Sequence, residues 1–227
     1  MKYQKNLQKQ HLIGTTSWLI PGTYYENARL VAQLVDFVEL LIYTWDEETK
    51  ELLDKELKSL KKLHEKYGLV YSVHLPVDTL ENVKAVLRYF NEDKNGEEGL
   101  DKKLPIINYV VHPFNDSDFL EIINSNEKIA VENLSQEVIN HHRTVFDIGH
   151  HLLGKKVDHS FLENIVEVHV MGVENGKDHK KLNEKTLDEI YKILRNKFHK
   201  VDYVCFEVFD LNDLIESLKI WKKYKNL

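Results

Sequence analysis

The sequence predicts a (β/α)8 barrel, an α/β fold in which eight parallel strands alternate with helices around one core. Two observations support this fold class. Eight short runs of apolar, β-branched and aromatic residues recur along the 227 residues, and amphipathic patterns of helical period separate them. No stretch resembles a linker between two folding units, so we expect residues 1–227 to form one compact TIM-barrel domain with residues 1–10 as a flexible arm.

The eight runs are typical of buried strands because Val, Ile, Tyr and Phe dominate them. In chain order, we expect strands at LIGTTSW (12–18), FVELLIY (37–43), VYSVHLP (70–76), INYVVHP (107–113), KIAVENL (128–134), TVFDIG (144–149), VEVHVMG (166–172) and YVCFEVF (203–209). At this length, strict alternation of strand and helix favours a barrel over an open doubly wound sheet.

Helical patterns follow the strands, with apolar residues three or four apart and Lys and Glu on the other faces. We expect helices at 24–35, 47–68, 79–90, 118–125, 135–140, 161–165, 185–197 and 211–225. The longest ends at Gly68, a typical residue for a helix C-terminus. Segment 91–103 has the composition of a flexible polar insertion.

Composition excludes several classes of function. A formal charge of −6 and a pI near 6.1 disfavour a nucleic-acid partner, since lysine and arginine dominate binding to phosphate backbones. The sequence contains neither a signal-peptide pattern nor the roughly 18 consecutive apolar residues of a membrane span. The single cysteine, Cys205, excludes an internal disulfide and suits a reducing compartment. We therefore expect a cytoplasmic protein that does not bind membranes.

Polar residues occupy the middle or last third of seven expected strands, and catalytic groups lie at the C-terminal ends of the strands in such barrels. They are Glu39, His74, His112, Glu132, Asp147, His169 and Glu207, with His150 close behind Asp147. Small residues such as Ser72, Ala130 and Cys205 precede three of them by two positions and so share their strand face. The polar side chains should therefore point into the barrel.

A metal site explains this set best. Buried carboxylates that converge on an apolar barrel cost several kcal/mol each unless they are paired or bind a cation. Imidazole and carboxylate together suit Zn²⁺, Mn²⁺ or Fe²⁺ better than Mg²⁺ or Ca²⁺. Glu167 lies one layer below His169, where the sequence assigns it no role.

Other polar residues give weaker signals. Thr15, Thr16 and Ser17 could contact a substrate phosphate or hydroxyl, or could only satisfy the main chain. The GKDH segment (176–179) follows the seventh expected strand; its Asp178 and His179 could bind a further metal ion, and its Lys177 a phosphate. The alternative is an exposed polar loop. The HHR segment (141–143) precedes a strand, and we expect it at the surface.

The ordered series VHLP, VHP, VEN, FDIGH, VHV and FEV resembles the xylose isomerase-like superfamily, which includes endonuclease IV. The resemblance to endonuclease IV implies that His74, His112 and Glu132 bind one metal ion. Glu132 would bridge to a second ion bound by Asp147, His169 and Glu207. A third ion would need His150 and an Asp-x-His pair, but here Asp178 and His179 are adjacent.

Sugar epimerases and isomerases of the same superfamily bind a single metal ion through matches to Glu132, Asp147, His169 and Glu207. The additional His74 and His112 favour a hydrolase with several ions. Two ions about 3.5–4 Å apart can activate water and stabilise both oxygens of a phosphodiester displacement. A single-metal epimerase remains the alternative, followed by abasic-site cleavage and non-catalytic corrinoid or metal binding.

Within the superfamily, the opening segment is similar to the cobamide-remodelling phosphodiesterases, the CbiR family. The shared elements are GTTS, P-x-x-Y-x-x-N-x-R, LVD and VEL, followed by YSVHLP. The resemblance implies hydrolysis of the nucleotide-loop phosphodiester of an adenosylcobamide, which gives adenosylcobinamide phosphate and the lower-ligand nucleoside.

This hypothesis assigns roles to the candidate residues. Two or more Zn²⁺ or Mn²⁺ ions are the expected cofactors, and the expected catalytic residues are Glu132, Glu207 and His150. Glu39 would support the site or contact substrate, together with Thr15, Thr16, Ser17 and Lys177. The expected partner is a small corrinoid substrate, and we expect a monomer.

Overall fold

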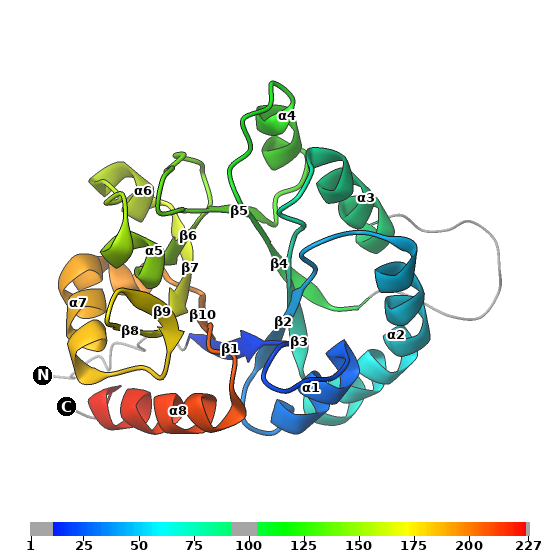
Figure 1. Cartoon of the computed structure of the whole chain (residues 1–227), viewed down its shortest axis with the longest axis horizontal. Coiled ribbons are helices and arrows are strands. Elements are labelled where there is room, and N and C mark those ends of the chain that lie inside the picture. The colour runs from blue at the N-terminus through cyan, green and yellow to red at the C-terminus, as the bar shows by residue number, and fades with distance from the viewer. Residues whose placement is uncertain (1–10, 92–103, 226–227) are drawn as a thin grey trace, which may run out of the picture.

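Eight parallel strands close into a barrel in the computed structural model, which describes residues 11–91 and 104–225 (Figure 1). They are β1 (Leu12–Thr16), β2 (Phe37–Leu41), β3 (Val70–His74), β4 (Ile106–Val111), β5 (Ile129–Glu132), β6 (Thr144–Asp147), β7 (Ile165–Val170) and β10 (Tyr203–Phe206). β1 pairs with both β2 and β10 and so closes the ring. The expected (β/α)8 barrel is confirmed, whereas the expected arm (1–10) and most of the insertion (91–103) lie outside the described residues.

Helices pack around the barrel. They are α1 (Tyr24–Val31), α2 (Glu47–Tyr67), α3 (Leu80–Asn91), α4 (Phe119–Asn124), α5 (Ile148–Leu153), α6 (His159–Glu163), α7 (Glu184–Leu194), followed by a 3₁₀ turn (Arg195–Lys200), and α8 (Leu211–Lys225). Among the described residues, none of these helices combines the length and apolar character that a membrane crossing requires.

Side-chain caps fix where the first two helices begin. Thr23 and Glu26 form a capping box at α1, in which each side chain binds the backbone N–H of the other residue. Asp46 accepts a hydrogen bond from the Thr49 N–H at the start of α2. The α2 helix ends as predicted at Gly68, whose φ of 74° suits glycine.

The prediction of a helix at 135–140 is wrong. Main-chain hydrogen bonds occupy this segment instead, including one from Lys155 N–H to the Ser135 carbonyl. A short helix is found instead further along the chain, in α5. The Asp147 side chain caps this helix by accepting a hydrogen bond from the His150 N–H at a distance of 2.6 Å. The strand that ends at Asp147 therefore turns directly into a helix that carries His150.

A hairpin that the sequence analysis missed lies between β7 and α7. It pairs β8 (Gly172–Glu174) with β9 (Lys177–Lys180) in antiparallel fashion. Asn175 and Gly176 connect the strands with φ angles of 54° and 73°, the two positive values of a type I′ turn. The Asn-Gly pair was the available signal. It was overlooked because the flanking strands are short and polar.

Just below the C-terminal ends of the strands, one layer of side chains fills the barrel interior, and this layer has an apolar half and a polar half. On the side of β4, β5 and β6 this layer is apolar, with Val110, Ala130 and Val145 fully buried. On the other side it is polar, with side chains that are also fully buried: Glu39, Ser72, Glu167 and Cys205. The metal-ligating candidates lie above both halves.

One residue of the HHR segment belongs to the interior, since His141 is only 9% exposed. Arg143 is half-buried and donates from Nη2 to the Asn108 Oδ1 at 2.8 Å. The expectation that this segment lies at the surface is therefore wrong for His141. The long arginine side chain reaches under the barrel, where a buried amide offers an acceptor.

Candidate metal centre

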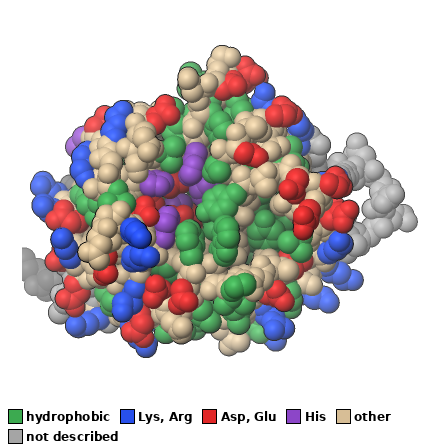
Figure 2. Space-filling model, viewed as in Figure 1, with side chains coloured by type: hydrophobic (Ala, Val, Ile, Leu, Met, Phe, Trp, Pro, Cys, Tyr) green, Lys and Arg blue, Asp and Glu red, His purple; other side chains and the backbone are tan. Residues whose placement is uncertain are grey.

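Seven polar side chains meet at the C-terminal ends of the strands, which we call the mouth of the barrel. They come from strand ends, from the residues that follow β4 and β10, and from α5: His74, His112, Glu132, Asp147, His150, His169 and Glu207. Figure 2 shows histidine side chains gathered near the centre of the viewed face, with acidic side chains between them and an apolar surface beside them. Residues far apart in sequence thus form one cluster.

The carboxylate of Glu132 faces different partners with its two oxygens. Oε2 lies 3.3 Å from Nε2 of His74 and 3.2 Å from Nε2 of His112. Oε1 lies 3.3 Å from Nδ1 of His169 and 3.6 Å from Nδ1 of His150. The side chain is 1% exposed. It therefore joins two donor groups, as a bridging carboxylate does.

The first donor group consists of His74, His112 and Glu132. The Nδ1 atom of His74 lies 3.1 Å from the Leu75 carbonyl oxygen, so this nitrogen carries a proton. In the metal-free protein Nε2 can donate to Glu132 at 3.3 Å, and loss of that proton would free its lone pair for a metal ion. This is the tautomer that a metal-binding histidine needs.

The second donor group consists of Glu132, Asp147, His169 and Glu207, all buried. Nδ1 of His169 lies 3.1 Å from Oε2 of Glu207 and 3.8 Å from Oδ2 of Asp147. These three atoms make no hydrogen bond with other described residues. Buried polar atoms without partners are costly, and a shared divalent cation would satisfy all three, so this residue set fits a metal ion.

The pKa values of the carboxyl groups at the mouth are shifted by burial, by one another and by the adjacent imidazoles. Burial raises the pKa of Asp147 well above its ordinary value, and the charges of Glu207 and Glu132 add to that effect. Burial also acts to raise the pKa of Glu207, but the adjacent His169 lowers it to about 2. At Glu132, burial also acts to raise the pKa, but the charge of His169 together with the hydrogen bond and charge of His112 holds it well below the usual range.

The pKa values of the buried imidazoles of His74 and His169 are raised. Burial alone would lower the pKa of His74, but the hydrogen bond and the charge of Glu132 raise it to about 9. At His169, the charges of Glu39, Glu132 and Glu207 outweigh burial and raise the pKa well above its usual value. The acidic mouth thus holds protons that a divalent cation would replace.

Asn133, which the sequence analysis overlooked, holds His150 and Asp147 in place. Its side chain accepts a hydrogen bond from the Asp147 N–H at 2.8 Å and donates to the Asp147 carbonyl at 3.1 Å. Its carbonyl oxygen lies 2.9 Å from Nδ1 of His150. Since Nδ1 donates there, Nε2 of His150 remains available for a metal ion or a proton. The asparagine directly after Glu132 was the available signal.

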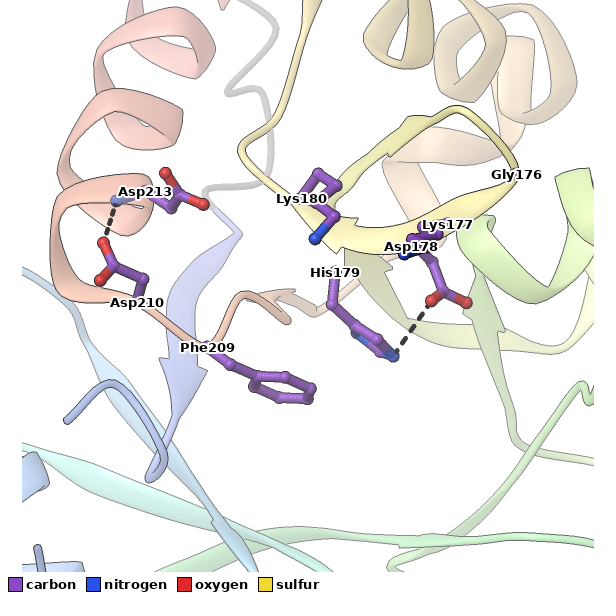
Figure 3. Close-up of a pocket in the computed structure, with 8 residues that line it drawn as sticks. All are labelled: Gly176, Lys177, Asp178, His179, Lys180, Phe209, Asp210 and Asp213. Atoms are coloured by element: carbon purple, nitrogen blue, oxygen red, sulfur yellow. Dashed lines mark hydrogen bonds and ion pairs between the residues drawn. The ribbon is translucent and has the colours of Figure 1, made fainter. Parts of the chain in front are cut away.

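Asp178 and His179 lie on the β8–β9 hairpin rather than in the donor groups (Figure 3). Among the described residues, neither belongs to a group of three or more donor atoms close enough to share one ion. Nδ1 of His179 lies 3.2 Å from the Glu207 carbonyl oxygen, and Nε2 lies 3.7 Å from Asp178. The geometry thus does not unite them with His150 in the third metal site that the sequence analysis considered.

A cavity of about 490 Å³ lies beside this hairpin (Figure 3). Lys177 and Lys180 line it from β9, and Phe209, Asp210 and Asp213 also line it. Lys177, which the sequence analysis proposed as a phosphate ligand, is thus an exposed side chain of this cavity.

The hydroxyl groups at the end of β1 bind the main chain. Thr15 donates to the Phe206 carbonyl at 2.9 Å, and Thr16 donates to the Val208 carbonyl at 3.4 Å. Ser17 accepts a hydrogen bond from the Leu41 N–H at 3.0 Å. The two threonines are fully buried, so the geometry favours the alternative in which they satisfy the backbone.

Glu39 lies below the mouth, not in it. It is fully buried, and its Oε2 accepts a hydrogen bond from Ser72 at 2.8 Å. Its Oε1 lies 3.7 Å from Nε2 of His169. Of the two roles expected for Glu39, this position below His169 favours support of the site over substrate contact.

Aromatic side chains border the mouth. The rings of Trp18 and Tyr43 have centroids 5.6 Å apart, those of Trp18 and Phe209 are 6.1 Å apart, and His179 stacks on Phe209 at 4.6 Å. Tyr43 in turn contacts the ring of His74. Trp18 and Phe209 are 51% and 39% exposed. We call Trp18, Tyr43, His179 and Phe209 the aromatic rim.

Asn27 shapes the loop that carries Trp18. Its Oδ1 accepts hydrogen bonds from the N–H groups of Leu19 and Ile20 at 2.7 and 3.0 Å, and its Nδ2 donates to the Thr23 carbonyl at 3.0 Å. The side chain is fully buried. The P-x-x-Y-x-x-N-x-R element of the sequence therefore includes the residue that fixes the loop after β1.

Comparisons with known proteins support the fold. No protein-family model matches the sequence, and a search of curated proteins gave no match. The solved structure of a D-tagatose 3-epimerase-like protein is similar, with 21% identity and a TM-score of 0.62 over 95% of this chain and 97% of that one. The structure of SacUVDE is similar with 12% identity and a TM-score of 0.56 over 96% and 100%. The chain therefore shares a TIM-barrel fold with these two structures.

Proposed function

We propose that the protein is a metal-dependent phosphodiesterase that hydrolyses the nucleotide-loop phosphodiester of adenosylcobamides. The products would be adenosylcobinamide phosphate and the lower-ligand nucleoside. The single observation that supports a hydrolase with two metal ions is the position of the Glu132 carboxylate. One oxygen faces His74 and His112, and the other faces His169, so two cations can bind side by side.

The substrate class rests on the mouth and on the opening sequence. The GTTS and P-x-x-Y-x-x-N-x-R elements resemble those of cobamide-remodelling enzymes. The aromatic rim offers exposed rings beside the donor groups, suited to the planar base and apolar edges of a corrinoid. The exposed amino group of Lys177 could form an ion pair with the phosphate of the corrinoid substrate. The overall charge of −6 disfavours a nucleic acid as the competing substrate.

Under this proposal, each residue at the mouth has a role in metal binding, in orienting water or in proton transfer. His74, His112 and Glu132 would hold one ion, and Glu132, Asp147, His169 and Glu207 the other. Bound ions supply charge stabilisation for the phosphoryl oxygens and lower the pKa of a water. Glu207, 5% exposed at the mouth, orients the attacking water. His150 can bind an ion or take up a proton at Nε2, since Nδ1 is committed to Asn133.

The decisive experiment incubates purified protein, loaded with Zn²⁺ or Mn²⁺, with an adenosylcobamide. Liquid chromatography with mass spectrometry should show adenosylcobinamide phosphate and the nucleoside appearing in equal amounts. The isosteric variant Glu132→Gln should lose at least a hundredfold in rate while it keeps its circular dichroism spectrum. An intact corrinoid after long incubation with the loaded protein would refute the proposal.

A single-metal sugar epimerase is the second candidate. The group of Glu132, Asp147, His169 and Glu207 is by itself sufficient for one ion. Elemental analysis separates the two candidates, because the phosphodiesterase requires about two ions per chain and the epimerase one. Turnover of a ketose by protein that contains one ion would favour the epimerase.

A further inference from the structure

The ring of His169 separates two groups of acidic side chains. Its Nδ1 faces the mouth, 3.3 Å from Glu132 and 3.1 Å from Glu207. Its Nε2 faces the polar layer below, 3.7 Å from Oε1 of Glu39 and 3.8 Å from Oε1 of Glu167. A cation at the mouth would bind Nδ1, and the ring proton must then reside on Nε2.

Each lower carboxylate is anchored by one oxygen and directs the other at this ring. Oε2 of Glu39 accepts a hydrogen bond from Ser72 at 2.8 Å, and Oε2 of Glu167 accepts one from Asn108 at 2.6 Å. The two Oε1 atoms make no hydrogen bond with any other described group. Both side chains are fully buried and cannot contact substrate.

We propose that Glu39 and Glu167 are positioning residues that keep the proton of His169 on Nε2 and present Nδ1 to a metal ion. Metal-binding histidines commonly donate their second ring N–H to a carboxylate, and loss of that partner typically weakens metal binding by about 10–100-fold. The inference accounts for Glu167 and for the polar half of the barrel interior. It requires a cation at the mouth but not the phosphodiesterase activity.

Replacement by glutamine tests the position of the proton. In Glu167→Gln, the amide oxygen would remain with its donor, Asn108, which leaves the amide NH₂ facing Nε2 of His169. That N–H would donate to Nε2 and shift the ring proton to Nδ1, where it blocks the metal ion. The variant Glu167→Met also removes the carboxyl group but offers no donor. Glu39→Gln and Glu39→Met form a second pair, anchored by Ser72.

The readout is the affinity for Zn²⁺, measured by competition with a chromophoric chelator, together with the visible spectrum of bound Co²⁺. Each glutamine variant should bind the ion at the second donor group about 10–100-fold more weakly than wild type, and more weakly than its methionine counterpart. A purely structural role would give the reverse order, because glutamine is the closer isostere. Equal affinity in wild type and glutamine variants overturns the inference.

Cys205 provides the control at the same depth. Its buried thiol lies in the same layer, with a donor atom within 4.8 Å of those of Glu39, Glu167 and His169. Cys205→Ala should leave Zn²⁺ affinity within about twofold, since a thiol adds little to the orientation of the ring. If Co²⁺-loaded protein instead shows a thiolate-to-cobalt band that Cys205→Ala abolishes, the lower layer binds an ion itself and the inference fails.

A milder variant covers the case in which the glutamate variants do not fold. Ser72→Ala removes only the hydrogen bond that anchors Glu39, and it should still weaken Zn²⁺ binding measurably. Unchanged Zn²⁺ affinity in Ser72→Ala would contradict the inference.

Discussion

If the mouth binds metal ions as proposed, single side chains there should decide how many. His112 contributes to the first donor group only, at 3.2 Å from Glu132, and is not part of the second. We expect His112→Ala to lower the metal content from about two ions to one and to reduce hydrolysis by at least a hundredfold. Mass spectrometry of the native protein would measure the content. Unchanged metal content would show that His112 is not a ligand.

His151, next to the centre, should make stability depend on pH. Burial and the charge of Lys156 lower its pKa from 6.5 to about 4. As the pH falls from about 6.5 to about 4, the unfolded chain takes up a proton that the folded chain excludes, so stability falls. Denaturation by urea should show this loss, about 1–2 kcal/mol from this residue. His151→Gln should show a flatter dependence; an unchanged slope would exclude His151 as the cause.

At the level of single residues, the sequence predicted the candidate ligands that gather at the mouth, but of the residues that hold them it singled out only Glu39. Glu132 and His169 stand out because a charged residue in an apolar strand is rare, and strand alternation gives their direction. Ser72 and Asn108 carry no such signal, and the position of Asn133 directly after Glu132 is a weak one, because small polar residues occur widely in strands and turns. Their importance depends on partners in distant strands, which only the closed barrel defines.

Among the elements, β1 needs its glycine. A Cβ atom on Gly14 would lie 2.4 Å from ring atoms of Phe37, which is fully buried. Gly14→Ala should therefore destabilise the fold by about 1–3 kcal/mol, as overpacking does. Urea denaturation checks the value. Addition of Phe37→Leu should recover part of the loss caused by Gly14→Ala, and strict additivity of the two changes would argue against the clash.

The loop between β1 and α1 should control substrate affinity rather than chemistry. Trp18 is half exposed and belongs to the aromatic rim, but it is not part of a donor group. We expect Trp18→Ala to raise KM for an adenosylcobamide about tenfold, equivalent to about 1.4 kcal/mol, with kcat and metal content nearly unchanged. Trp18→Phe should retain most of the affinity. A fall in kcat alone would place Trp18 in a different role.

The elements themselves were largely predictable. Each of the eight barrel strands overlaps its expected segment because continuous apolar runs leave little alternative. The β8–β9 hairpin was not predicted, since its strands are polar and owe their pairing to the Asn175–Gly176 turn. The absent helix at 135–140 has a similar cause: a six-residue segment has little intrinsic helix stability, and hydrogen bonds to Lys155 and within the loop compete with it.

For the whole molecule, metal binding should be coupled to stability and pH. Removal of ions by a chelator should lower Tm by several degrees, because ions that bind only the folded state stabilise it. Zn²⁺ affinity should increase as the pH rises toward the pKa of His74, about 9 in the metal-free protein, since the ion must displace protons. Calorimetry in buffers of different ionisation enthalpy would count the protons released. Binding that releases none would contradict the assigned ligands.

The spread of donors along the chain bears on how the protein matures. Glu207 follows the last barrel strand, whereas His74 ends the third. The second donor group is therefore complete only after β10 and Glu207 have been synthesised and the barrel has closed. If this group binds an ion as proposed, a chain that stops before β10 should not retain it, so ion uptake there would report closure of the barrel.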